Sequence, residues 1–297
     1  MRSLKLYIIY VVMAVVACAV AIGCVGPIDS KPIVTVTIPP QKYLVEQIAG
    51  DNIDVRCLLA NGANPETYDP TVTNMMNLDK SIAFLRLGSV GFEEAILDKI
   101  SSVNRSLPVY NISEGIVPVR GTHHHHHPGS SEKLDDEIDP HKWTSVKNAV
   151  VMAGNILDAL SEVDPGNAGK YHRNYDRLMA HLDSLDRAIA ARIDSAGHRA
   201  FVVWHPSLSY FARDYGLVQC VIGGGENKEV SVAELRHAID DAHEHDARVM
   251  FIQDDSERRK LMTVASMLDV DEVEINLLSS DWENQILKIA DALVSHE

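Results

Sequence analysis

Short, nearly continuous apolar runs alternate along the chain with longer segments whose apolar residues recur every three or four positions. The short runs have the length and β-branched content of strands, and the longer segments have the period of amphipathic helices. Strands that are apolar on both faces are typical of a sheet covered on both sides, so the alternation predicts an α/β fold with mostly parallel sheets. The predicted strands lie in residues 32–40, 53–62, 81–88, 107–113, 199–205, 218–224, 247–253 and 270–278.

A long amphipathic segment divides this alternation into two regions. Residues 165–196 carry apolar positions at helical spacing with charges between them, over a length that is unusual for a globular helix. We therefore predict a rigid linking helix here. It would join an N-terminal α/β lobe, residues 32–164, to a C-terminal α/β lobe, residues 197–297.

Residues 114–140 interrupt the first region. They contain Gly, Pro, Ser and a run of five histidines, His123–His127, but no apolar periodicity, which predicts a mobile surface loop. The run has three interpretations: an expression tag, a random solvated loop, or a low-affinity collector of cations beside a tighter site. The acidic stretch at 135–139 favours the collector.

The first thirty residues differ from the rest of the chain. Arg2 and Lys5 precede an uncharged apolar stretch that reaches Asp29, as in a secretory signal, although the stretch is long enough for an uncleaved membrane anchor. Small residues before Cys24 resemble a lipobox. We predict a signal peptide over 1–23, lipidation of Cys24, and a tether over 24–31, with the remaining chain on the outer face of the cell membrane.

Composition narrows the class of partner. The 297 residues carry a formal charge of −15 and include 14 histidines. A nucleic-acid binder normally shows a basic patch, and docking on anionic lipid also needs positive charge, so neither is expected. An acidic, histidine-rich chain instead indicates cations as ligands.

Three polar residues follow predicted strands or precede a helix, each in a loop with proline. They are Glu66 in NPETYDP, His141 in DPHKW and His205 at the start of HPSLSY. Ligands of parallel sheets bind beyond the carboxyl ends of the strands, and proline lowers the entropy lost when a loop residue is fixed. One carboxylate with two imidazoles is a recognised transition-metal set. Spacing alone leaves open that these are ordinary surface residues.

These motifs resemble those of a known family. GANPETYDP (62–70), the histidine run, DPHKW (139–143) and HPSLSYFARDYGL (205–217) occur in the order seen in cluster A-I (ZnuA-like) metal-binding lipoproteins of ABC importers, which deliver zinc or manganese. The resemblance implies two α/β lobes joined by a helix, a metal in the cleft between them, and delivery to an ABC permease driven by its ATPase.

Two positions depart from the family pattern. Glu66 stands where the family usually has His, and Asn276 stands where it often has Asp. We keep Glu66, His141 and His205 as the proposed metal ligands. The fourth ligand stays open among Asn276, Gln253, Asp281 and water, and Asp281 has the alternative role of a helix N-cap.

Imidazole at position 205 favours Zn²⁺ over Mn²⁺ as the transported ligand, because Mn²⁺ prefers carboxylates. We therefore expect a monomeric, non-enzymatic solute-binding protein that captures Zn²⁺, with a manganese carrier of the same family as the alternative. A metal-buffering or adhesin-like surface lipoprotein is a further alternative. A secreted zinc hydrolase is less favoured, because no H-E-x-x-H motif is present.

Overall fold

The computed structural model describes residues 31–60, 62–65, 68–88, 90–120, 138–223, 230–253 and 255–294. The chain divides into a unit that ends at Pro32 and a unit from Ile33 to Glu297, and the fold below is that of the second unit. The predicted signal, Cys24, Glu66 and the histidine run lie outside the described residues.

The first lobe contains a four-stranded sheet in the order β2-β1-β3-β4, and every strand pair in it is parallel. Its elements are β1 (Ile33–Val36), α2 (Pro39–Ala49), the 3₁₀ turn η1 (Gly50–Asn52), β2 (Asp54–Cys57), α3 (Val72–Asp79), β3 (Ser81–Arg86), α4 (Gly91–Val103) and β4 (Val109–Asn111). Two prolines, Pro39 and Pro40, open α2, where a missing N–H has no helical partner to lose.

The second lobe repeats this design with the order β6-β5-β7-β8, again parallel throughout. Its elements are β5 (Ala200–Val203), α7 (Ser209–Tyr215), β6 (Val218–Val221), α8 (Val232–Glu244), β7 (Val249–Ile252), α9 (Asp255–Leu268), β8 (Asp271–Glu274) and α10 (Trp282–Val294). Gly216 ends α7 in the left-handed conformation, with φ of 64°, that favours glycine.

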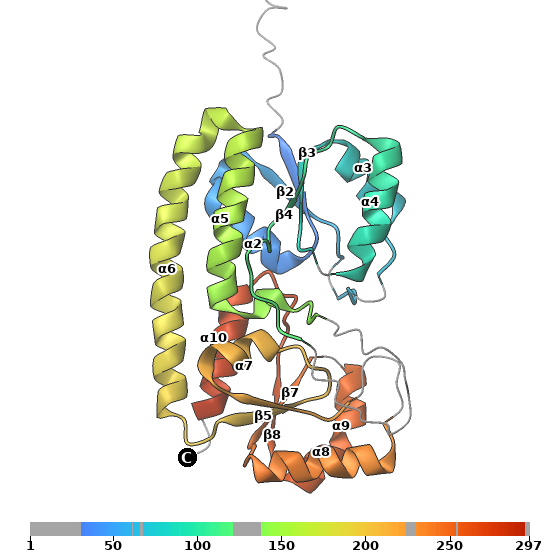
Figure 1. Cartoon of the computed structure of the whole chain (residues 1–297), viewed down its shortest axis with the longest axis vertical. Coiled ribbons are helices and arrows are strands. Elements are labelled where there is room, and N and C mark those ends of the chain that lie inside the picture. Colours follow the sequence, from blue (N-terminus) through green and yellow to red (C-terminus); the bar gives the residue numbers. More distant parts are fainter. Residues whose placement is uncertain are drawn as a thin grey trace, which may run out of the picture. The chain divides into compact units, whose positions relative to one another are not determined.

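The segment between the two sheets is helical. It comprises the 3₁₀ turn η2 (Lys142–Thr144), α5 (Val146–Val163), the 3₁₀ turn η3 (Pro165–Asn167) and the 28-residue helix α6 (Ala168–Ser195). Figure 1 shows α5 and α6 side by side on one side of the first sheet, with α3 and α4 on its other side. Because α6 contacts α2 and α5 as well as α10, it packs against elements of both lobes.

One hydrophobic core is continuous across both lobes. It takes in the first sheet, α5, α6, α7 and α10, and the faces of β5 and β7 that carry Phe201 and Phe251. A smaller core fills the opposite face of the second sheet beneath α8 and α9. The two lobes therefore share buried apolar contacts and are not linked by a flexible connector alone.

The predicted α/β fold with two parallel sheets and a long linking helix is confirmed. Several predicted strands were too long: β2 ends at Cys57 and does not reach residue 62, and β8 ends at Glu274 and does not reach residue 278. Ile275 and Leu277 are buried in a loop, which accounts for an apolar run that resembles a strand. In the part of the chain that the structure covers, no helix has both the length and the apolar content to cross a membrane.

Candidate metal centre

The segment Asp139–Pro140–His141 is held at every main-chain polar group that it presents. The N–H of Asp139 donates to the carbonyl of Val119 at 3.0 Å, and the N–H of His141 donates to Oδ1 of Asp139 at 2.8 Å. The carbonyl of His141 accepts from the hydroxyl of Thr144 at 2.8 Å, and that of Pro140 accepts from the N–H of Lys142 at 2.8 Å. The local backbone is therefore fixed before any ligand binds.

Asp139 also fixes the imidazole of His141. Its Oδ1 lies 2.8 Å from Nδ1 of His141, and both side chains are buried. Burial alone would raise the pKa of Asp139, but the hydrogen bonds from the side chain and main chain of His141 lower that pKa below its ordinary value. An ionised carboxylate only accepts, so Nδ1 carries the proton and Nε2 is left as the lone-pair donor for a metal.

His205 follows β5, beside the point where the strand order of the second sheet reverses. In an open parallel sheet this is the place where ligands bind. Gln253 follows β7 on the other side of that point, and its Nε2 donates to the buried hydroxyl of Ser207 at 2.7 Å. The N–H of Ser207 donates to the carbonyl of His205 at 2.8 Å. Both ring nitrogens of His205 are shielded from solvent.

The two predicted histidine ligands meet. The ring centroids of His141 and His205 lie 5.0 Å apart at an interplanar angle of 69°, although the residues are 64 positions apart in the chain. Within the described ranges no set of three His, Cys, Asp or Glu side chains is arranged to hold a metal. This pair of imidazoles is the described part of the candidate site.

Glu66 lies outside the described residues, but the residues around it place the end of its loop. The ring of Tyr68 packs against Phe92 in an edge-on contact at 5.2 Å. Its hydroxyl lies 2.8 Å from the carbonyl of Leu58 and 2.8 Å from Oδ1 of Asn74. Tyr68 therefore anchors the loop to the carboxyl end of β2 and to α3.

Two of the candidates for the fourth ligand have other partners. Oδ1 of Asn276 accepts from the N–H of Leu278 at 3.0 Å, and Oδ1 of Asp281 accepts from Nδ2 of Asn284 in the first turn of α10 at 2.8 Å. Both residues are exposed. These contacts suit the alternative role of Asp281 at the start of α10, whereas Gln253 bonds directly to the loop that carries His205.

Two tryptophans bind the turn after His141 to the loop after β8. The indole N–H of Trp143 donates to the carbonyl of Leu277 at 2.8 Å, and the indole N–H of Trp282 donates to the carbonyl of Trp143 at 2.7 Å. Both rings are buried, and the ring centroids of His141 and Trp143 lie 5.1 Å apart. The pair therefore connects a metal-ligand candidate to α10 through direct contacts.

The carboxylate of Glu93 is buried in the first lobe, against the residues that follow β3. Glu93 accepts from the hydroxyl of Thr37 and from the N–H groups of Leu87 and Gly88, each of the latter at 2.7 Å. Burial raises the pKa of Glu93. These hydrogen bonds lower it, but the effect of burial is larger and the pKa stays above its ordinary value. Burial lowers the pKa of Lys142, and the charge of Glu93 opposes that effect, so the two groups are electrostatically linked.

Sequence reasoning identified His141 and His205 as candidates but gave no role to Asp139, Ser207 or the two tryptophans. Asp139 had a visible signal, because it lies two residues before a proposed ligand in a proline turn. The tryptophan contacts had none, because they join residues 134 and 139 positions apart.

Comparisons with known proteins identify the family of this chain. The ZnuA family, described as zinc-uptake complex component A, periplasmic, matches residues 34–294. The high-affinity zinc uptake system protein ZnuA of Bacillus subtilis is 27% identical over 260 residues, which cover 85% of this chain and 81% of that protein.

Solved structures give the same result. A ZnuA deletion mutant with zinc bound superposes with a TM-score of 0.79 at 30% identity, covering 90% of this chain and all of the other. A manganese-bound periplasmic metal-binding protein of Candidatus Liberibacter asiaticus has a TM-score of 0.75 at 23% identity, covering 89% of this chain and all of the other, and shows a shared fold.

The family match covers most of the chain, and the family is a non-enzymatic transport component, which excludes the hydrolase alternative. The chain therefore belongs to the ZnuA family, the extracytoplasmic metal-binding proteins of ABC uptake systems.

Proposed function

We propose that this protein captures Zn²⁺ between its lobes with Glu66, His141 and His205 and delivers it to a membrane permease driven by an ATPase. The observation that carries the proposal is the pair of imidazoles 5.0 Å apart, one of them already oriented by Asp139. Two neutral imidazoles and a carboxylate suit Zn²⁺ better than Mn²⁺. Gln253 or a water completes the set.

The domain limits proposed from the sequence suit this role. A first lobe over 32–164 and a second lobe over 197–297 each contribute one imidazole, and the linker over 165–196 separates them. A lipid on Cys24 would hold the monomeric protein at the outer face of the membrane. Mass spectrometry of the mature N-terminus tests this anchor, because an unmodified Cys24 or an uncleaved leader would contradict it.

Calorimetric titration with Zn²⁺ in a competing chelator tests the site. Glu66→Ala, His141→Ala and His205→Ala should each weaken binding about tenfold or more, because each removes one ligand. His172→Ala, on the exposed surface of α6, is the matched control and should bind like wild type. Wild-type affinity in all three ligand variants would refute the assignment.

Two further measurements separate the alternatives. Metal analysis after equilibration with equal Zn²⁺ and Mn²⁺ should recover zinc, and recovery of manganese would make the protein a manganese carrier. Deletion of the gene should slow growth when zinc is limiting. Normal zinc uptake in the deletion strain would favour a metal-buffering or adhesin-like surface lipoprotein instead.

A further inference from the structure

The short helix α7 holds the segment that carries His141. Tyr210 on this helix is fully buried, and its hydroxyl donates to the carbonyl of Asp139 at 2.9 Å. The same hydroxyl accepts from the N–H of Val119 at 3.3 Å. The N–H of Asp139 also donates to the carbonyl of Val119. The phenol of Tyr210 therefore ties both of these segments of the chain to α7.

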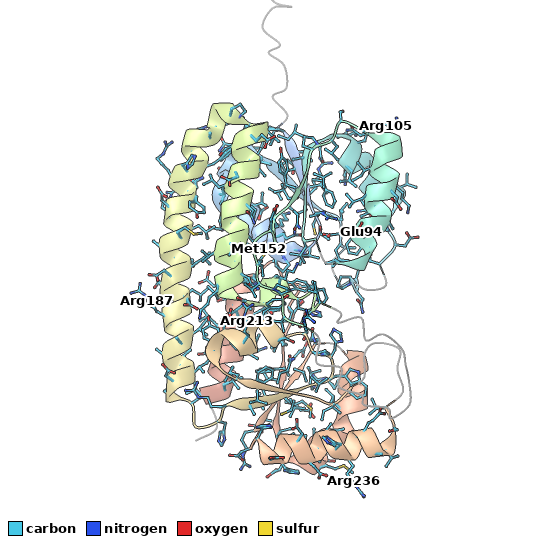
Figure 2. All side chains as sticks on the ribbon, viewed as in Figure 1. Glu94, Arg105, Met152, Arg187, Arg213 and Arg236 are labelled. Carbon is cyan, nitrogen blue, oxygen red and sulfur yellow. The ribbon has the colours of Figure 1, made fainter. Side chains whose placement is uncertain are left out.

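Other residues of α7 reinforce this attachment. Arg213, labelled in Figure 2, donates to the carbonyl of Val117 at 3.0 Å and to Oδ1 of Asn148 in the first turn of α5 at 3.1 Å. Asp214 accepts a hydrogen bond from Ser145. The chain on both sides of His141 is therefore docked on α7.

The same helix is tied to His205. It begins four residues after His205, and the intervening N–H of Leu208 donates to Oε1 of Gln219 on β6 at 2.8 Å. Nε2 of Gln219 donates in turn to the hydroxyl of Ser209 at 3.0 Å. Both imidazoles thus take their position from one short helix, although they come from different lobes.

We propose that Tyr210 is a positioning residue that sets the spacing of His141 and His205, by fixing Asp139 on the helix that follows His205. This proposal rests on the proposed function, since the spacing matters only if both imidazoles bind metal. Without the phenol oxygen, the carbonyl of Asp139 loses its donor, and Asp139 is fixed less firmly beside Nδ1 of His141. Part of the free energy of zinc binding would then be used to order the two imidazoles, so the zinc affinity would fall.

Tyr210→Phe in the full chain tests the proposal, with Zn²⁺ as the probe. Zinc affinity should fall about fivefold, the factor expected for one lost hydrogen bond. Tyr215→Phe is a matched control, because Tyr215 lies on the same helix and its hydroxyl donates to Asp186 on α6 at 2.7 Å, away from Asp139. It should lose stability but keep wild-type affinity.

A spectroscopic measurement separates positioning from a general loss of stability. In wild type the Nδ1 proton of His141 should give a downfield NMR signal, as expected for a bond to a carboxylate. In Tyr210→Phe this signal should shift upfield or broaden, and in Tyr215→Phe it should not change. Ser209→Ala removes the hydroxyl through which α7 is bonded to Gln219. If Tyr210→Phe does not fold, this variant should weaken zinc binding in the same direction, because it loosens the same helix.

The outcomes distinguish the two proposals. Wild-type affinity in His141→Ala would refute the proposed function. Weak binding in His141→Ala together with wild-type affinity in Tyr210→Phe and Ser209→Ala would overturn the role of Tyr210 and leave the function intact. Equal weakening in Tyr210→Phe and Tyr215→Phe would also overturn it.

Discussion

Oδ1 of Asp139 lies 2.8 Å from Nδ1 of His141, and the same oxygen accepts the main-chain N–H of His141 at 2.8 Å. One carboxylate oxygen therefore fixes the ring orientation, the tautomer and the backbone of a proposed metal ligand. Carboxylates in this position raise the basicity of the ligand imidazole, and their loss commonly reduces metal affinity.

Asp139→Ala should therefore weaken Zn²⁺ binding about tenfold to a hundredfold, the range known for such partners of ligand histidines. Chelator competition measures the affinity. Asp54→Ala is the control, because Asp54 bonds to Arg56 on β2 and has no contact with the imidazole pair. Unchanged affinity in Asp139→Ala would show that His141 is oriented by other contacts.

The tryptophan contacts should couple the two lobes energetically. Trp282→Phe leaves the carbonyl of Trp143 without its donor, and Trp143→Phe does the same to the carbonyl of Leu277. Each substitution should lower the free energy of unfolding by about 1–3 kcal/mol, measured by urea titration. Both bonds join the turn after His141 to the segment around the start of α10, so each should contribute less once the other is lost. The loss in the double variant should therefore be smaller than the sum of the two separate losses. Additive losses, within about 0.5 kcal/mol, would contradict the coupling.

Glu93 should give stability a distinct pH dependence. Its pKa is raised in the folded protein, so the folded state holds this proton above the ordinary glutamate pKa of about 4.3. The folded state then binds more protons than the unfolded state, and the stability contributed by Glu93 decreases as pH rises through that window.

Urea titrations across this window test the sign. The stability of wild type relative to Glu93→Gln should fall as pH rises from about 4 and then level off above the raised pKa. Glu94→Gln, exposed on the same helix, is the control for the substitution itself. A difference that grows with pH would contradict the prediction.

The histidine run should affect capacity more than tight binding. Removal of residues 122–130 should leave the affinity of the tight site unchanged, because the proposed ligands lie elsewhere in the chain. The number of Zn²⁺ ions bound per chain at high zinc should fall, as measured by metal analysis after equilibrium dialysis. A loss of the tight site would show that the run contributes to it directly.

The fold and part of the candidate site could be predicted from local sequence patterns. The alternation of strands and helices predicted both sheets, and the rule for strand ends selected the loop that carries His205. The helical spacing of apolar residues predicted α6, because a helix of 28 residues repeats this spacing many times. The strand predicted over 270–278 was too long at its carboxyl end, because Ile275 and Leu277 are apolar residues buried in a loop.

The contacts that position the ligands could not be predicted in this way. The bond from Tyr210 to Asp139 and the bond from Trp143 to Leu277 join residues far apart in the chain. Such pairs depend on how α7, α10 and the turn η2 pack together, and no local spacing records that packing. Asp139 was the exception, since its contact with His141 spans two residues.

The placement of the tryptophans gives the protein a built-in optical reporter. The chain has three tryptophans. Trp143 packs near His141 and receives the bond from Trp282, while Trp204 directly precedes His205. All of the indole emission therefore arises from side chains adjoining the proposed ligands or bonded to their neighbours. Binding of Zn²⁺ at the proposed ligands should therefore change the intrinsic fluorescence, which can be measured without attaching a dye.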